Sequence, residues 1–158
     1  MSTDLIARYS AGSAVLSCSV AGLAPADLDA FPIPGTWSIR QIVVHTLDSD
    51  LIATHRLRRI VAEELPLLVS YDETLFAKTL RYEDVDMALA LRLFTDNRAF
   101  TTLLLNHLPE PAWARVGIHS QRGKITVADI VRMYADHVDH HVGFIIKKRA
   151  LLGKPLPG

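Results

Sequence analysis

Cysteine and long apolar runs are nearly missing from this 158-residue chain, and each absence excludes a class of protein. Cys18 is the single cysteine, so no internal disulfide is possible and an oxidising compartment is not indicated. No apolar run reaches the roughly eighteen residues that a membrane-spanning helix needs. Residues 1–4 lack the positive flank and apolar run of a secretory signal. We therefore expect a cytoplasmic protein with no membrane partner, and we expect Cys18 to be a buried structural thiol because small residues precede it.

Neither sign of charge is in excess. Lys and Arg together number 17, as do Asp and Glu, so the formal net charge is zero. A nucleic-acid-binding protein needs a basic surplus to neutralise phosphates, so this balance argues against such a partner. Hydrophobic residues make up 49% and charged residues 22%, a globular composition. The length fits a single domain over residues 1–158, and no repeat, low-complexity tract or long linker interrupts it.

Proline and glycine divide the sequence into four long helical segments and their connections. The predicted long helices cover residues 4–22, 38–65, 84–108 and 126–152, and the predicted short helical turns lie near residues 26–30 and 72–78. We expect residues 113–124 to be irregular, and we find no convincing strand pattern. Four helices without strands predict an all-α four-helix bundle.

Two of these helices begin with a clear capping signal. Ser38 is followed three residues later by Gln41, which is the S-x-x-Q form of the capping box. Thr126 is followed by Asp129 at the same spacing, which gives the last helix a similar start. The second and fourth long helices are therefore expected to begin at Ser38 and Thr126.

Histidines crowd into the last predicted helix. His137 and His141 are four residues apart, which places both on one face of the helix, and an i, i+4 pair is a common way for a helix to chelate a metal. The helical period puts this pair at the edge of the apolar face, whereas Asp136 and Asp139 face solvent. His140 lies near the boundary and can face either way. The alternative is a pair of partly buried histidines held by hydrogen bonds alone.

A third metal ligand must come from another helix. His45 is the best candidate, because it lies among apolar residues of the second predicted helix. Asp48, three residues later, can orient it or a bound water. His55 should lie about 15 Å from His45 along the helix, too far to share an ion. His107 is close to a helix end, and His119 lies in the segment expected to be irregular, where it is a reserve ligand.

His45, His137 and His141 are thus the predicted ligands of one divalent metal. Three neutral imidazoles leave Zn²⁺ or Ni²⁺ with open positions, as in catalytic sites. Such an ion lowers the pKa of a bound water or thiol and produces a nucleophile at neutral pH. A ferritin-like di-metal site is disfavoured because the chain has no Glu-x-x-His pair. No general acid or base can be assigned, and the pocket residues to consider by helix position are Asp48, Tyr134 and Arg98.

Three stretches resemble the DinB-like superfamily of metal-binding four-helix bundles, also called DinB/YfiT-like. Residues 35–45 are similar to the family's W-[ST]-x-[RK]-[EQ]-[IVL]-x-x-H segment, and residues 71–73 resemble its connection between the second and third helices. Residues 123–141 resemble its last helix, which ends in H-x-x-H-H. The resemblance covers about residues 34–148. It implies an up-down-down-up bundle, frequent homodimers, and the same three ligands, with His140 as a non-ligating histidine.

The resemblance also implies a metal-dependent enzyme. Similar bundles include thiol S-transferases that use low-molecular-weight thiols, a maleylpyruvate isomerase and metal-dependent hydrolases. We expect, first, thiol transfer to small electrophiles, with a small-molecule substrate and a low-molecular-weight thiol as partners. Hydrolysis by a metal-activated water is the alternative among enzymes, and a non-catalytic metal-binding or ligand-binding bundle is the alternative outside them.

Overall fold

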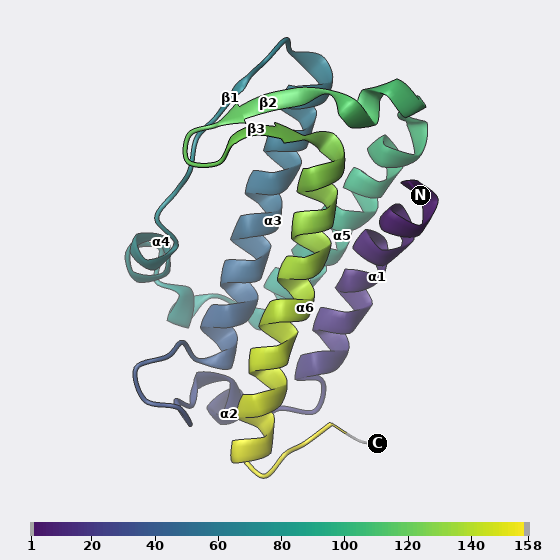
Figure 1. Cartoon of the computed structure of the whole chain (residues 1–158). Coiled ribbons are helices and arrows are strands. Elements are labelled where there is room, and N and C mark those ends of the chain that lie inside the picture. Colours follow the sequence, from purple (N-terminus) through teal and green to yellow (C-terminus); the bar gives the residue numbers. More distant parts are fainter. Residues whose placement is uncertain (1, 157–158) are drawn as a thin grey trace.

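The computed structural model describes residues 2–156, in which four long helices form a bundle (Figure 1). They are α1 (Ser2–Val20), α3 (Ile39–Ala62), α5 (Met87–His107) and α6 (Val127–Leu151). In Figure 1, α1 and α6 run in one direction and α3 and α5 in the other, so the order along the chain is up-down-down-up. α1 and α3 each pack against both α5 and α6. The predicted fold class and topology are confirmed. Across residues 2–156, no helix combines the length and apolarity needed to cross a membrane.

Shorter helices and strands join the four long helices. The helical ones are α2 (Pro25–Asp29), α4 (Glu73–Thr79) and the 3₁₀ helices η1 (Tyr82–Asp84) and η2 (Glu110–Ala114). The strands are β1 (Leu67–Leu68), β2 (Val116–His119) and β3 (Gly123–Thr126). β2 pairs in parallel with β1 and antiparallel with β3. The resulting sheet lies where α3 ends and α6 begins (Figure 1), so it covers that end of the α3–α6 pair.

The expectation of an irregular segment over residues 113–124 was wrong. Val116 pairs with Thr126 and His119 with Gly123, which makes a short hairpin. Gly117 is a residue of β2, and a Cβ there would lie 2.8 Å from the side chain of Leu68. A glycine at this position therefore lets β2 approach β1 and α3 closely.

The capping signals are confirmed at both helix starts. The Ser38 hydroxyl accepts a hydrogen bond from the Gln41 amide at 3.2 Å, and the Gln41 side chain accepts one from the Ser38 amide at 3.0 Å. Thr126 and Asp129 make the same reciprocal pair, with both distances 3.1 Å. α3 ends at Ala62, earlier than the predicted residue 65.

Arg98 is a structural residue of the core rather than a pocket residue. Its guanidinium pairs with Asp50 of α3 at 2.9 Å and donates to the backbone carbonyls of Tyr9 in α1, at 2.5 Å, and Tyr134 in α6, at 2.7 Å. One side chain of α5 thus contacts the other three long helices. Two apolar clusters make up most of the core. One is centred on Tyr9, Leu57 and Ile130, and the other on Leu16, Phe94 and Ile145.

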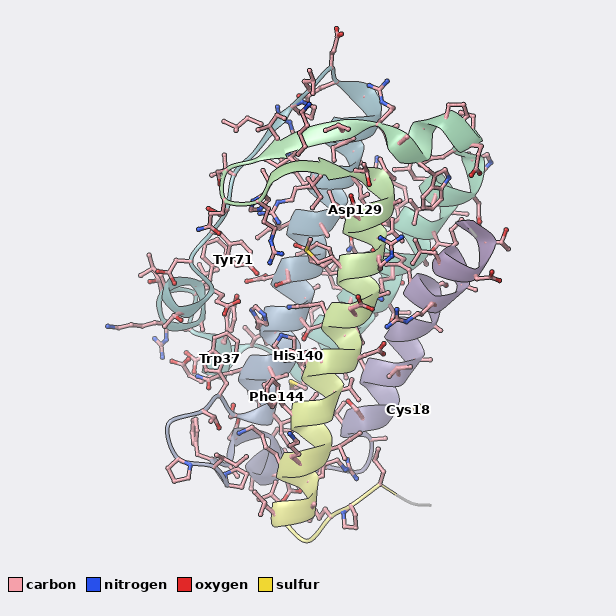
Figure 2. All side chains as sticks on the ribbon, viewed as in Figure 1. Cys18, Trp37, Tyr71, Asp129, His140 and Phe144 are labelled. Atoms are coloured by element: carbon pink, nitrogen blue, oxygen red, sulfur yellow. The ribbon has the colours of Figure 1, made fainter. Side chains whose placement is uncertain are left out.

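Cys18 lies exposed on the outer side of α1 (Figure 2), so the prediction of a buried thiol was wrong. The face that α1 buries contains Tyr9, Gly12, Leu16 and Ser19. These positions recur every three or four residues, and Cys18 falls between them. Small neighbours in the sequence therefore gave no information about which face Cys18 occupies.

Candidate metal centre

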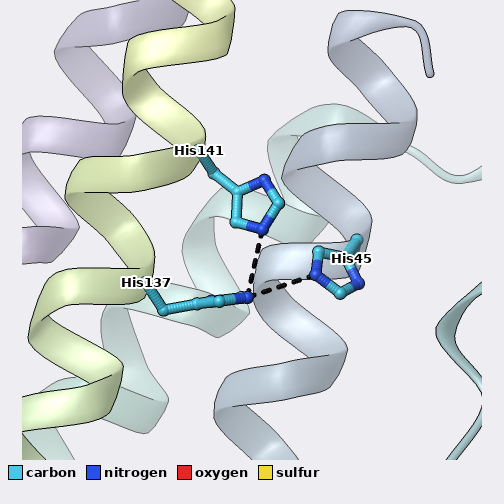
Figure 3. A group of neighbouring side chains, drawn as sticks. All are labelled: His45, His137 and His141. Carbon is cyan, nitrogen blue, oxygen red and sulfur yellow. Dashed lines mark hydrogen bonds between the residues drawn. The ribbon is translucent and has the colours of Figure 1, made fainter. Parts of the chain in front are cut away.

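His45, His137 and His141 converge on one point between α3 and α6 (Figure 3). The Nε2 atom of His137 lies 3.2 Å from Nε2 of His45 and 3.1 Å from Nε2 of His141. One nitrogen from each ring falls within 4.8 Å of the others. His45 and His141 are buried and His137 is half-buried. The structure therefore brings together the three histidines predicted from the sequence.

Packing of α3 against α6 positions the three rings. His137 and His141 occupy successive turns of α6 on the side that faces α3, as their i, i+4 spacing predicts. Their neighbours Asp136 and Asp139 are exposed, as expected. His45 extends from α3, and the indole of Trp37 lies against its ring with centroids 4.8 Å apart. The cluster thus combines two helices that run antiparallel.

All three histidines are neutral at physiological pH. Burial lowers the pKa of His45 to about 4. Burial, together with the other histidines of the cluster, lowers the pKa of His137 and of His141 to about 3. A neutral imidazole keeps the lone pair that a metal ligand must offer, so the environment favours the ligating form.

The donor set fits a divalent ion. Ligands at about 2.0–2.1 Å in a tetrahedral site lie roughly 3.3 Å apart, and the two Nε2–Nε2 distances of 3.2 and 3.1 Å are close to that edge. Without an ion, the single lone pair or proton on Nε2 of His137 cannot satisfy both contacts. Nδ1 of His45 and Nδ1 of His141 are also buried without a hydrogen-bond partner in the described part of the chain. A cation shared by the three Nε2 atoms would satisfy both contacts of His137 at once, whereas the unpartnered Nδ1 atoms lie away from that point and do not bear on the ion.

The carboxylate that approaches His45 is that of Glu73, and not that of Asp48, which was the candidate from the sequence. Asp48 accepts a hydrogen bond from the Tyr82 hydroxyl at 2.6 Å and makes none to His45, whose Nδ1 has no partner within the described residues. Glu73 of α4 instead places a carboxylate oxygen 3.7 Å from Nε2 of His45. Sequence reasoning assigned no role to Glu73, although it belongs to the stretch 71–73 that carries the family resemblance.

Two cavities of different character reach the cluster. The first, about 210 Å³, has His137 in its wall together with polar side chains of α3, the sheet end and the loop before α4, among them Ser49, Arg56, Tyr71, His119 and Arg122. The second, about 550 Å³, has His141 in its wall with Trp37, Ile42, Phe144 and Lys148, and is mainly apolar. Figure 2 labels Tyr71, which lines the first cavity, and Trp37 and Phe144, which line the second. Glu73 contributes to both walls.

The remaining histidines lie outside the cluster. His140 is exposed, and its ring packs edge-on against His141 and Phe144 at centroid distances of 5.2 and 4.7 Å. His119 is buried in the wall of the first cavity, where its Nδ1 accepts a hydrogen bond from the Gln121 amide at 3.2 Å. His55 and His107 are exposed. The reserve ligand His119 therefore does not join the three-histidine group.

Tyr134, the other pocket candidate, lines the first cavity. Its hydroxyl accepts a hydrogen bond from Arg56 at 3.1 Å, and burial raises its pKa. Tyr71 lies in the same wall, where its hydroxyl pairs with that of Ser49 and burial raises its pKa to about 12. Both phenols therefore keep their protons at neutral pH.

Known proteins of similar sequence include candidate metal-dependent hydrolases. The sequence pattern of the DinB superfamily matches residues 9–145. A protein of Oceanobacillus iheyensis is 29% identical over 83% of this chain and 76% of its own, and one of Bacillus pumilus is 30% identical over 78% and 70%. Both are named as candidate metal-dependent hydrolases.

Two solved structures share the fold. YfiT of Bacillus subtilis is described as a candidate metal-dependent hydrolase with an unusual four-helix bundle topology. It superposes with a TM-score of 0.90 at 25% identity, covering 96% of this chain and 87% of YfiT. The four-helix bundle protein TT2238 superposes with a TM-score of 0.65 at 19% identity, over 92% and 98%, and supports the fold alone.

Proposed function

This chain belongs to the DinB superfamily, and on that premise we propose that it is a divalent-metal-dependent enzyme that transfers a low-molecular-weight thiol to a small electrophile. The observation that carries the proposal is the pair of cavities that reach the three-histidine cluster, one at His137 and the other at His141. A reaction between two small molecules needs a place for each beside the activating centre. The polar cavity at His137 and the apolar cavity at His141 offer two such places.

His45, His137 and His141 would hold the ion, for which Zn²⁺ or Ni²⁺ fits a set of three imidazoles. When bound, the ion lowers the pKa of a coordinated thiol or water towards neutrality. Glu73 is suited to accept the released proton, because its carboxylate is solvent-accessible and lies 3.7 Å from Nε2 of His45. Tyr71 can donate a hydrogen bond to a substrate in the first cavity, since its high pKa keeps it protonated.

Hydrolysis is the second candidate, and two observations favour it. Glu73 beside the cluster could serve equally as a base for water. The Oceanobacillus and Bacillus relatives are also named as hydrolases, although such a name says nothing about the substrate of this chain. Hydrolysis needs only one organic substrate, so it leaves the second cavity without a role.

Metal content and a paired activity assay test both candidates. The protein is purified without a histidine tag, and metal is quantified in wild type and in a His45→Ala variant. We expect about one Zn or Ni per chain in wild type and loss of the metal in the variant. Absence of metal from wild type after reconstitution with Zn²⁺ and Ni²⁺ would overturn the proposal.

The activity assay uses glutathione or cysteine with a chromogenic aryl halide, and p-nitrophenyl esters without thiol. Metal-dependent loss of free thiol supports transfer, whereas ester cleavage that needs no thiol supports hydrolysis. Bound metal with neither activity would leave the non-catalytic binding bundle as the better description. In a Glu73→Gln variant we expect metal content to persist and turnover to fall about 10²–10⁴-fold, the usual loss when a general base is removed.

A further inference from the structure

Arg56 of α3 is a buried cation without an acidic partner. Its side chain is 7% exposed and lies in the wall of the first cavity. Nη1 donates to the Tyr134 hydroxyl at 3.1 Å and Nη2 to the backbone carbonyl of Val69 at 2.7 Å. Nε has no hydrogen-bond partner within the described residues. Both partners of the guanidinium are neutral, so its positive charge is not compensated.

Arg98 is a second buried arginine of this fold, and it lies in the core rather than in a cavity wall. The Asp50 carboxylate lies 2.9 Å from Nη2 of Arg98 and neutralises its charge. Buried charges in proteins are normally paired in this way because removing an ion from water is costly. In the described part of the chain no carboxylate lies within ion-pair distance of Arg56, although the site is comparably buried. Arg149 is also buried without an ion-pair partner, but backbone carbonyls of Ser19, Ala21 and Lys154 hold its guanidinium. Arg56 differs because its Nε has no partner within the described residues and its side chain lines a cavity, so a ligand could supply its counterion.

The rest of the cavity wall favours an anion. Arg122, on the turn between β2 and β3, lines the same cavity, as does His119. Burial and then the charges of Arg56 and Arg122 lower the pKa of His119, which is a sign of positive potential there. Glu73 is the acidic residue of the wall, and it lies beside His45 rather than beside Arg56.

We propose that Arg56, assisted by Arg122, binds the anionic group of a small substrate in the first cavity, with the rest of the substrate directed towards His137. Guanidinium groups recognise planar carboxylates and phosphates through paired N–H donors, a geometry that lysine does not offer. A cavity of about 210 Å³ admits a metabolite-sized anion and not a peptide. The inference rests on the proposed function for the reacting end of the substrate and adds to it a substrate class, organic acids or phosphorylated compounds.

The test is a titration of the full-length chain, followed by amide chemical shifts in a chloride-free buffer without carboxylate or phosphate. The probes are succinate and inorganic phosphate. Each titration is run on protein as purified and after metal has been stripped with a chelator. The variants are Arg56→Gln, Arg56→Lys and Arg122→Gln. Arg58→Gln is the matched control, because Arg58 is on the same helix and carries the same charge but is exposed and packs over the ring of Phe100.

We expect saturable shifts around the first cavity in both preparations, at least about tenfold weaker binding in Arg56→Gln, and no change in Arg58→Gln. Arg56→Lys should recover only part of the affinity, because lysine keeps the positive charge and lacks the paired N–H donors of the guanidinium. Equal weakening in Arg58→Gln, or unchanged binding in Arg56→Gln, would overturn the proposal. If Arg56→Gln does not fold, Arg122→Gln decides, because an exposed turn residue can be replaced without unfolding.

The two probes and the two preparations separate the remaining explanations. Tighter binding of succinate assigns a carboxylate substrate, and tighter binding of phosphate assigns a phosphorylated one. Binding that disappears when the metal is stripped reflects coordination to the ion and overturns the role of Arg56. A chain that binds the anion through Arg56 but never retains metal would refute the proposed function while leaving the anion site in place.

Discussion

Asp50 and Arg98 form an ion pair that solvent does not reach, since each side chain is 1% exposed. The Asp50 carboxylate accepts hydrogen bonds from Arg98 at 2.9 and 3.1 Å and from the Asn97 side chain at 2.8 Å. The other donors of Arg98 are held by backbone carbonyls of α1 and α6. In an Asp50→Leu variant the guanidinium would stay in the core with hydrogen bonds but no countercharge.

The cost of this change is large compared with the stability of a domain. Removing one member of a buried pair costs about 3–5 kcal/mol, because the other charge stays desolvated. The total free energy of unfolding of a domain is typically only about 5–15 kcal/mol. At this chain length, 1 kcal/mol corresponds to about 2–4 °C, so we expect Tm to fall by about 6–20 °C.

Thermal and urea unfolding followed by circular dichroism measure the effect. The double variant Asp50→Leu, Arg98→Met should recover most of the loss, because it removes both charges and keeps apolar volume in the core. An Asp84→Leu control breaks the exposed pair with Arg81 and should change stability by less than about 1 kcal/mol. A loss below about 1 kcal/mol in Asp50→Leu alone would refute the description of Arg98 as a buried, neutralised cation.

Three further predictions follow from the cluster and from the helix packing. His137→Ala and His141→Ala should each abolish metal retention while the far-ultraviolet circular dichroism stays helical, and unchanged metal content in both would disprove the ligand assignment. Because burial lowers the pKa of His45 to about 4 and of His137 and His141 to about 3 from an ordinary value of 6.5, the unfolded chain binds more protons than the folded chain. The free energy of unfolding of the metal-free protein should therefore have its full value above about pH 6.5 and fall as the pH is lowered from there towards 3. Urea melts that give the same free energy at pH 7 and pH 5 would contradict this. Gly12→Ala should destabilise the protein by about 1–3 kcal/mol, because the new Cβ would lie 2.2 Å from Nη1 of Arg98, whereas Gly143→Ala in α6 meets no described atom within 4 Å and should be neutral or slightly stabilising in the same melts.

Helix starts and the histidine pair could be predicted from the sequence because their determinants are local. A capping box needs only residues three apart, and Ser38 with Gln41 behaves as its spacing indicates. The pair His137 and His141 shares a face for the same reason. The choice of His45 rested on its apolar neighbours and on the family resemblance, because the contact between α3 and α6 joins residues 92 positions apart in the chain.

The sheet could not be predicted, since its strands have two and four residues and depend on pairing between distant segments. Arg56 was missed for a different reason. It stands in a run with Arg58 and Arg59, which resembles a solvated basic stretch. The period of α3 nevertheless offers a signal, because Arg56 lies eleven residues, or about three turns, after His45 and so returns to the same face.

That shared face of α3 sets a limit on the substrate. Arg56 and His45 are separated by about 16 Å along the helix axis at 1.5 Å per residue, with Ser49 between them in the wall of the first cavity. A one-carbon acid cannot hold Arg56 and present a reacting atom at the cluster at the same time. If both proposals hold, kcat/KM across a homologous series of ω-substituted acids should rise to an optimum at an intermediate chain length, and Arg56→Gln should remove that optimum while leaving the metal in place.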